Sequence, residues 1–109
     1  MKTISLYFND QLVFDYEKES LEEQQLSFLD KMDNDMDRGI KIKGELISKP
    51  DSKQRATFVS LNLLRALQQE NESIISASCA YLSSRLPLLV EVRAAKQDDG
   101  VNISLVEEH

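Results

Sequence analysis

Hydrophobic and polar residues alternate near both ends of the chain, with the period of two that is typical of half-buried β-strands. The first alternation runs through residues 4–16. It is interrupted by Asn9-Asp10-Gln11, residue types that tolerate the left-handed backbone of a tight turn. The second alternation runs through residues 90–105 and is interrupted by Asp98-Asp99-Gly100. Each of them predicts a β-hairpin.

A helical pattern follows the first hairpin. Apolar residues at three- and four-residue steps predict a helix over residues 20–38. Ser20 and Glu23 fit a capping box at its start, and Gly39 is suited to end it. Residues 39–50 are predicted to form a loop with an extended portion, because two isoleucines alternate with lysines there but a second glycine interrupts the strand pattern.

Two further helices are predicted in the second half of the chain. Asp51 and Gln54 fit a capping box before residues 56–67, whose apolar side chains cover most of the helix circumference and predict the central, buried helix. Five polar residues at 68–72 interrupt the pattern, and a third helix is predicted over residues 73–86, just before a proline. Its apolar face is expected to consist of Ile74, Ile75, Ala77, Ser78, Tyr81 and Leu82.

These elements predict one α+β domain over residues 1–109, in the order ββ-ααα-ββ. We expect the two hairpins to join into one four-stranded antiparallel sheet, with two or three helices packed on one face. The edges of so small a sheet also favour a homodimer, because an unpaired edge strand can pair with a second copy.

Composition narrows the class of protein. A chain of 109 residues, 41% of them hydrophobic, has room for one modest core. Cys79 is the only cysteine, which excludes an intramolecular disulfide, and its small, apolar neighbours predict a buried structural thiol. The start of the chain lacks the apolar core of a signal peptide, and no stretch is apolar enough to span a membrane. We therefore expect a cytoplasmic protein.

The charge of the chain is acidic and uneven. A net charge of −6 disfavours binding to nucleic acid and to an anionic membrane surface. Residues 40–55 nevertheless hold five basic residues against two acidic ones: Lys41, Lys43, Lys49, Lys53 and Arg55. Either this segment balances charge across a solvated surface, or it forms a patch for an acidic partner.

No catalytic constellation is recognisable. The only histidine, His109, is the last residue, where a side chain is hard to preorganise for a catalytic triad or a zinc site, and whether it is native stays open. The few glycines form no phosphate-binding loop. Glu91 lies between two valines, but strand alternation places it on the solvent side. Small residues predict a face of the third helix that lets helices approach closely: Ser73, Ser76, Ala77, Ser78, Ala80, Ser83 and Ser84.

The acidic segment 33–45 partly resembles a calcium-binding loop. Asp33, Asp35 and Asp37 occupy the first, third and fifth positions, but Gly39 and Glu45 each fall one residue late. Two alternatives explain the same residues, namely a solvated acidic helix face and a docking surface for a basic partner.

The sequence thus predicts a small, non-enzymatic protein-interaction or regulatory module without a cofactor. Two alternatives stay open. One is a module that binds calcium or another divalent metal through Asp33, Asp35, Asp37 and Glu45. The other is a small enzyme that works through carboxylates.

Overall fold

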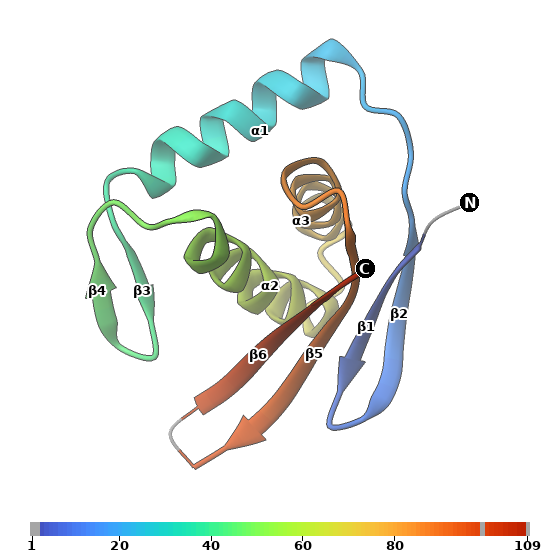
Figure 1. The fold of residues 1–109 in the computed structure, drawn as a ribbon, viewed down its shortest axis with the longest axis vertical. Coiled ribbons are helices and arrows are strands. Elements are labelled where there is room, and N and C mark those ends of the chain that lie inside the picture. Colours follow the sequence, from blue (N-terminus) through green and yellow to red (C-terminus); the bar gives the residue numbers. More distant parts are fainter. Residues whose placement is uncertain (1–2, 99, 109) are drawn as a thin grey trace.

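The computed structural model describes residues 3–98 and 100–108 and combines a four-stranded sheet, a separate short hairpin and three helices (Figure 1). In chain order the elements are β1 (Thr3–Phe8), β2 (Gln11–Glu17), α1 (Glu23–Met36), β3 (Ile40–Ile42), β4 (Glu45–Ile47), α2 (Ser52–Gln68), α3 (Glu72–Arg85), β5 (Leu89–Gln97) and β6 (Gly100–Glu107). The α+β class and the two terminal hairpins are as the sequence predicts. The additional hairpin between α1 and α2 changes the predicted order of elements.

The large sheet is mixed, with strand order β2-β1-β5-β6, so the prediction of an antiparallel sheet was wrong. Its hairpins join through their first strands, which run parallel, with Leu6 opposite Val92 and Phe8 opposite Ala94. Parallel and antiparallel strands show the same alternation of side chains, so the pattern along the chain does not distinguish them. Strands β1 and β5 lie at the centre of the sheet, because they carry its fully buried side chains.

The turn of the first hairpin is confirmed. Asn9 and Asp10 both have positive φ angles, 50° and 68°, which match the right-handed twist of the flanking strands. Asn9 also holds this turn to β5, because its Oδ1 atom accepts a hydrogen bond from the backbone N–H of Lys96 at 3.0 Å. In the turn of the last hairpin, Asp99 lies outside the described residues.

The start of α1 differs from the prediction. Glu22, not Ser20, is the N-cap residue, and its backbone N–H donates to Oε1 of Gln25 at 2.8 Å. The spacing of Glu22 and Gln25 is the same as that of the predicted pair, so the capping pattern fits two registers of the chain. The helix ends at Met36, and Gly39, with a φ of 112°, follows after one further turn.

The segment predicted as a loop is a hairpin. Strands β3 and β4 pair in antiparallel fashion, with Ile40 opposite Ile47. Lys43 and Gly44 form the two-residue turn between them, with φ angles of 53° and 78°. Gly44 therefore does not interrupt a strand, as the sequence prediction assumed, but supplies the left-handed backbone that the turn requires.

The two remaining helices begin much as predicted. Asp51 caps α2, because its Oδ1 atom accepts from the backbone N–H of Gln54 at 2.8 Å and its own N–H donates to Oε1 of Gln54 at 2.9 Å. Asn71 caps α3 by accepting from the N–H of Ile74 at 3.3 Å. The predicted apolar face of α3 was wrong at Ile74, whose side chain is 43% exposed. Cys79 is buried in the same helix, as the sequence predicted.

The helices form two layers on one face of the large sheet (Figure 1). Helices α2 and α3 lie next to the strands, and α1 crosses over them on the far side. The core between these layers includes Leu6, Leu29, Leu63, Leu82, Leu89 and Val92. The other face of the sheet is polar, and there the guanidinium of Arg93 lies 4.3 Å from the ring centre of Tyr7. Among the described residues, no helix is both long and apolar enough to cross a membrane.

One buried polar group in the core yields a stability prediction. Ser60 in α2 is fully buried, and its hydroxyl has no hydrogen-bond partner in the described structure. Because an unsatisfied buried hydroxyl is destabilising and alanine favours helices over serine, Ser60→Ala should raise the free energy of unfolding by about 1 kcal/mol. Urea unfolding measures it. Ser76→Ala, at an exposed position of α3, controls for helix propensity, and an equal gain in both variants would contradict the prediction.

Candidate functional site

A polar cluster joins the three helices around Asp33. We call it the Asp33 cluster and define it by Asp30, Asp33, Asp37, Arg55, Tyr81 and Arg85. The Nη1 atom of Arg55 donates to Oδ1 of Asp33 at 3.1 Å, and Nε of Arg85 donates to Oδ2 at 3.1 Å. The hydroxyl of Tyr81 also donates to Oδ1. A single carboxylate of α1 thus accepts from one residue of α2 and two of α3.

The partners of Asp33 keep its carboxylate ionised. Burial alone would raise the pKa of Asp33, but the hydrogen bonds from Tyr81, Arg55 and Arg85 outweigh that effect, and the pKa lies below its ordinary value. Burial, and then the hydrogen bond to Asp33, raise the pKa of Tyr81, whose hydroxyl therefore stays protonated. With each charge paired, the cluster serves to hold α1 against the other helices.

The residues of the calcium hypothesis do not meet at one point. Asp33 and Asp37 face Arg55, so their carboxylates are already paired with a cation. Asp35 is exposed on α1, and Glu45 is exposed on β4. Within residues 3–98 and 100–108, no three His, Cys, Asp or Glu side chains gather as a metal site requires. Their spacing in the sequence suggested a calcium loop, but α1 continues to Met36, and β3 and its turn into β4 take up most of the rest of the segment.

The other groups with possible chemistry lie apart from one another. Cys79 is buried in α3, and burial raises the pKa of its thiol to about 12, so it stays protonated near neutral pH. Glu91 lies on the polar face of the sheet and accepts from Nε of Arg93 at 2.7 Å. His109 lies outside the described residues. Within the described part of the chain these groups do not assemble into a catalytic site, and the grooves are the candidate functional sites.

A groove of about 720 Å³ lies between the β3–β4 hairpin, α2 and the β5–β6 hairpin, which flank one another in Figure 1. We call it the basic groove, because the described residues that line it include no acidic side chain and four basic ones: Lys41, Lys43, Arg65 and Lys96. Apolar side chains that pack against the core also line it: Phe8, Phe58, Leu64 and Val101.

The cations of the basic groove are available to a ligand. Lys41, Arg65 and Lys96 are exposed, and none of them forms an ion pair within the described part of the chain. Lys43 donates from its Nζ atom to Oδ1 of Asn102, a neutral partner that leaves the positive charge uncompensated. Four positive charges thus converge from separate elements of an acidic protein.

The sequence pattern pointed to only two of the four basic residues of this groove. It noted the basic segment that contains Lys41 and Lys43, but Lys49 and Lys53 do not line the groove, and Arg55 belongs to the Asp33 cluster. It missed Arg65 and Lys96. Both lie outside the basic segment 40–55 in the sequence, and only the packing of α2 and β5 beside the β3–β4 hairpin brings them to it.

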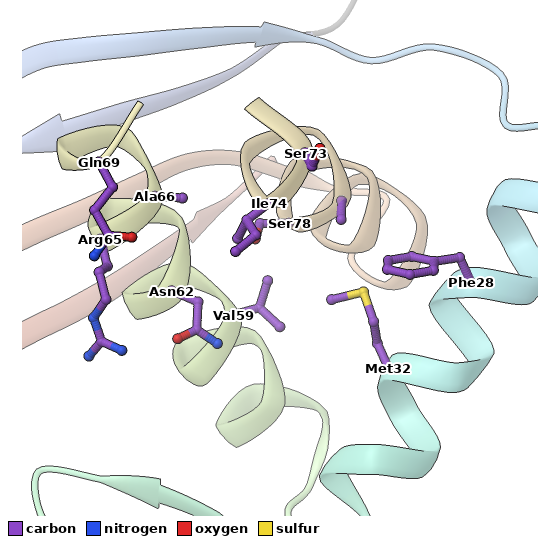
Figure 2. Close-up of a pocket in the computed structure, with 11 residues that line it drawn as sticks. Phe28, Met32, Val59, Asn62, Arg65, Ala66, Gln69, Ser73, Ile74 and Ser78 are labelled. Carbon is purple, nitrogen blue, oxygen red and sulfur yellow. The ribbon is translucent and has the colours of Figure 1, made fainter. Parts of the chain in front are cut away.

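A second groove, of about 390 Å³, lies between α1, α2 and α3 (Figure 2). Phe28 and Met32 point from α1 toward α2 and α3. We call this the apolar groove and define it by Phe28, Met32, Val59, Ala66, Ile74 and Ala77. The side chains of Phe28 and Ile74 are 50% and 43% exposed, so large apolar surfaces face solvent at its mouth.

Comparisons with known proteins add no functional assignment. The chain matches no protein-family model, and no curated protein and no solved structure is significantly similar to it. The grooves are therefore the features of this protein that bear on its function.

Proposed function

We propose that this protein is a non-enzymatic interaction module that binds a short acidic segment of a partner protein in the basic groove. The observation that carries the proposal is the convergence of Lys41, Lys43, Arg65 and Lys96 on one hollow whose lining, among the described residues, includes no acidic side chain, in a chain of net charge −6. A chance distribution of charge on this chain would favour acidic side chains in such a hollow.

The lining of the groove fits a peptide segment better than a free anion. Carboxylates along the ligand would meet the four cations, while Phe8, Phe58 and Val101 offer apolar contact area to its backbone and methylene groups. The cations also come from β3, the β3–β4 turn, α2 and β5 and so surround the groove. Such an arrangement matches charges spread along a chain, and does not close around one small ion.

The charge of the whole molecule favours a short protein segment over nucleic acid. Fields are screened within about 8 Å at physiological ionic strength, so a ligand inside the groove experiences mainly its cations. A nucleic acid extends beyond the groove and would meet the rest of a molecule whose net charge is −6. A cytoplasmic location stays a prediction.

A labelled hexaglutamate peptide tests the proposal. Fluorescence anisotropy should show saturable binding in about 50 mM NaCl that weakens strongly toward about 500 mM, because the contacts are ionic. Replacing Lys41→Glu together with Lys96→Glu should weaken binding by about tenfold or more, since each change removes an attraction and adds a repulsion. Both side chains are exposed, so the variant should fold.

A matched variant distinguishes the groove from net charge. Lys31→Glu with Lys53→Glu changes the total charge equally but leaves the basic groove intact, because neither residue lines it. We expect this variant to bind like the parent protein. Equal loss in both double variants would overturn the proposal, as would the absence of binding to the parent. An oligothymidylate of equal charge is the nucleic-acid probe. If it bound more tightly than hexaglutamate, and if Lys41→Glu with Lys96→Glu abolished that binding, the groove would be assigned to nucleic acid instead.

A further inference from the structure

The basic groove and the apolar groove are neighbours on α2. Asn62 and Arg65, one helical turn apart, line both of them. The exposed side chain of Arg65 points away from Phe28 and Met32 (Figure 2). A ligand that crosses α2 at this turn therefore passes from a cationic surface to an apolar one without leaving the protein.

Small side chains on α3 keep the apolar groove open. Ser73 and Ala77 line the apolar groove and also a second hollow of about 540 Å³ on the other side of Phe28. The sequence pattern predicted that such residues let the helices approach closely. In the structure they leave space beside α1 instead, and the ring of Phe28 stands half-exposed between two hollows.

The apolar groove exposes large apolar side chains, which a partner bound only through polar contacts would leave uncovered. Phe28 of α1 and Ile74 of α3 line the groove together with Val59 and Ala66 of α2. Large apolar side chains that gather at an open hollow are typical of binding sites, whereas scattered ones are ordinary.

We infer that the apolar groove is a second subsite for the same partner segment, which carries an apolar anchor residue next to its acidic residues. The inference rests on the proposed function of the basic groove. The occupant follows from charge complementarity and from the shared wall: carboxylates of the segment lie against Lys41, Lys43 and Lys96, and the anchor enters beside Phe28 and Ile74.

The thickness of α2 sets the spacing within the segment. A helix with its side chains is about 10 Å across, and an extended chain advances about 3.3 Å per residue. About three residues therefore separate the last acidic residue from the anchor. A helical ligand would need a longer spacing because it rises only about 1.5 Å per residue.

Three labelled peptides test the inference. The first has four glutamates, a Gly-Ser-Gly spacer and a terminal phenylalanine, the second has serine in place of that phenylalanine, and the third has the phenylalanine directly after the glutamates. Anisotropy titrations should show the first peptide binding about tenfold tighter than either of the others, because only it places the ring in the apolar groove.

Variants of the protein locate the anchor. Ile74→Gln should remove the advantage of the first peptide while leaving the affinity for the serine peptide unchanged. Gln is neutral and is well suited to the third position of α3, so the variant should fold. Leu88→Gln, at a 48% exposed position that lines neither groove, should leave both affinities unchanged.

The outcomes separate this inference from the proposed function. If no glutamate peptide binds, both are overturned. If all three peptides bind equally, with sensitivity to Lys41→Glu and Lys96→Glu but not to Ile74→Gln, only the anchor subsite is overturned. Sedimentation of the unliganded protein is the last check: a dimer that dissociates on Phe28→Ala would mean that a second copy occupies the apolar groove, which also overturns the inference.

Discussion

Leu29→Ala should lower the free energy of unfolding by about 3 kcal/mol. Leu29 is 1% exposed and belongs to the main core, so shortening it removes apolar contacts and leaves a cavity. The only other buried residue of α1 is Met36, at the helix end. Few other contacts therefore hold α1 to the core once the Leu29 side chain is shortened. Urea unfolding followed by circular dichroism measures the change.

Leu26→Ala is the matched control for this prediction. Leu26 lies one turn earlier in α1 but is 41% exposed, so its truncation should cost less than about 1 kcal/mol. Similar losses in the two variants would contradict the packing of α1 against the other helices, on which the apolar groove depends.

Asp33→Asn should lower the free energy of unfolding by about 2 kcal/mol. The change removes the charge that faces Arg55 and Arg85 and places an amide where Tyr81 and both arginines need an acceptor. The loss stays moderate because Arg55 keeps Asp37 and Arg85 keeps Asp30. Urea unfolding at neutral pH measures it.

The pH dependence of this loss has a definite sign. The pKa of Asp33 in the folded protein is below its ordinary value of 3.8, so its contribution is fully present above that value and is lost as the pH falls through the folded pKa. The difference between parent and Asp33→Asn should therefore be constant near neutral pH and shrink below about pH 4. Asp35→Asn, on the exposed side of α1, is the control at neutral pH and should lower the free energy of unfolding by less than about 0.5 kcal/mol.

Local features of the fold were readable in the sequence because they depend on neighbouring residues. The alternating patterns at both ends predicted the terminal hairpins, and Asn9-Asp10 predicted the first turn. The Asp51 cap was predicted because its hydrogen-bond partner lies three residues away. Where the prediction was wrong, as at the start of α1, two capping patterns of equal spacing competed.

Other features depend on which elements meet in three dimensions. The direction of β5 relative to β1 leaves no trace in the alternation of either strand, so the mixed sheet was not predicted. The exposure of Ile74 was missed for a similar reason, because α1 covers α3 without closing over its first turn (Figure 2). Helical periodicity indicates an apolar face but does not say whether a partner covers it.

The candidate site likewise has a part that the sequence predicted and a part that only the structure shows. By itself the sequence determined an acidic, single-cysteine α+β chain with a basic segment that includes Lys41 and Lys43 and without a recognisable catalytic motif. Only the tertiary structure brought Arg65 and Lys96 to that segment and paired Asp33 with the arginines of two other helices. The physical reason is that turns and caps are set by interactions within a few residues, whereas charge pairs and grooves arise from distant side chains that the packing of the core places side by side.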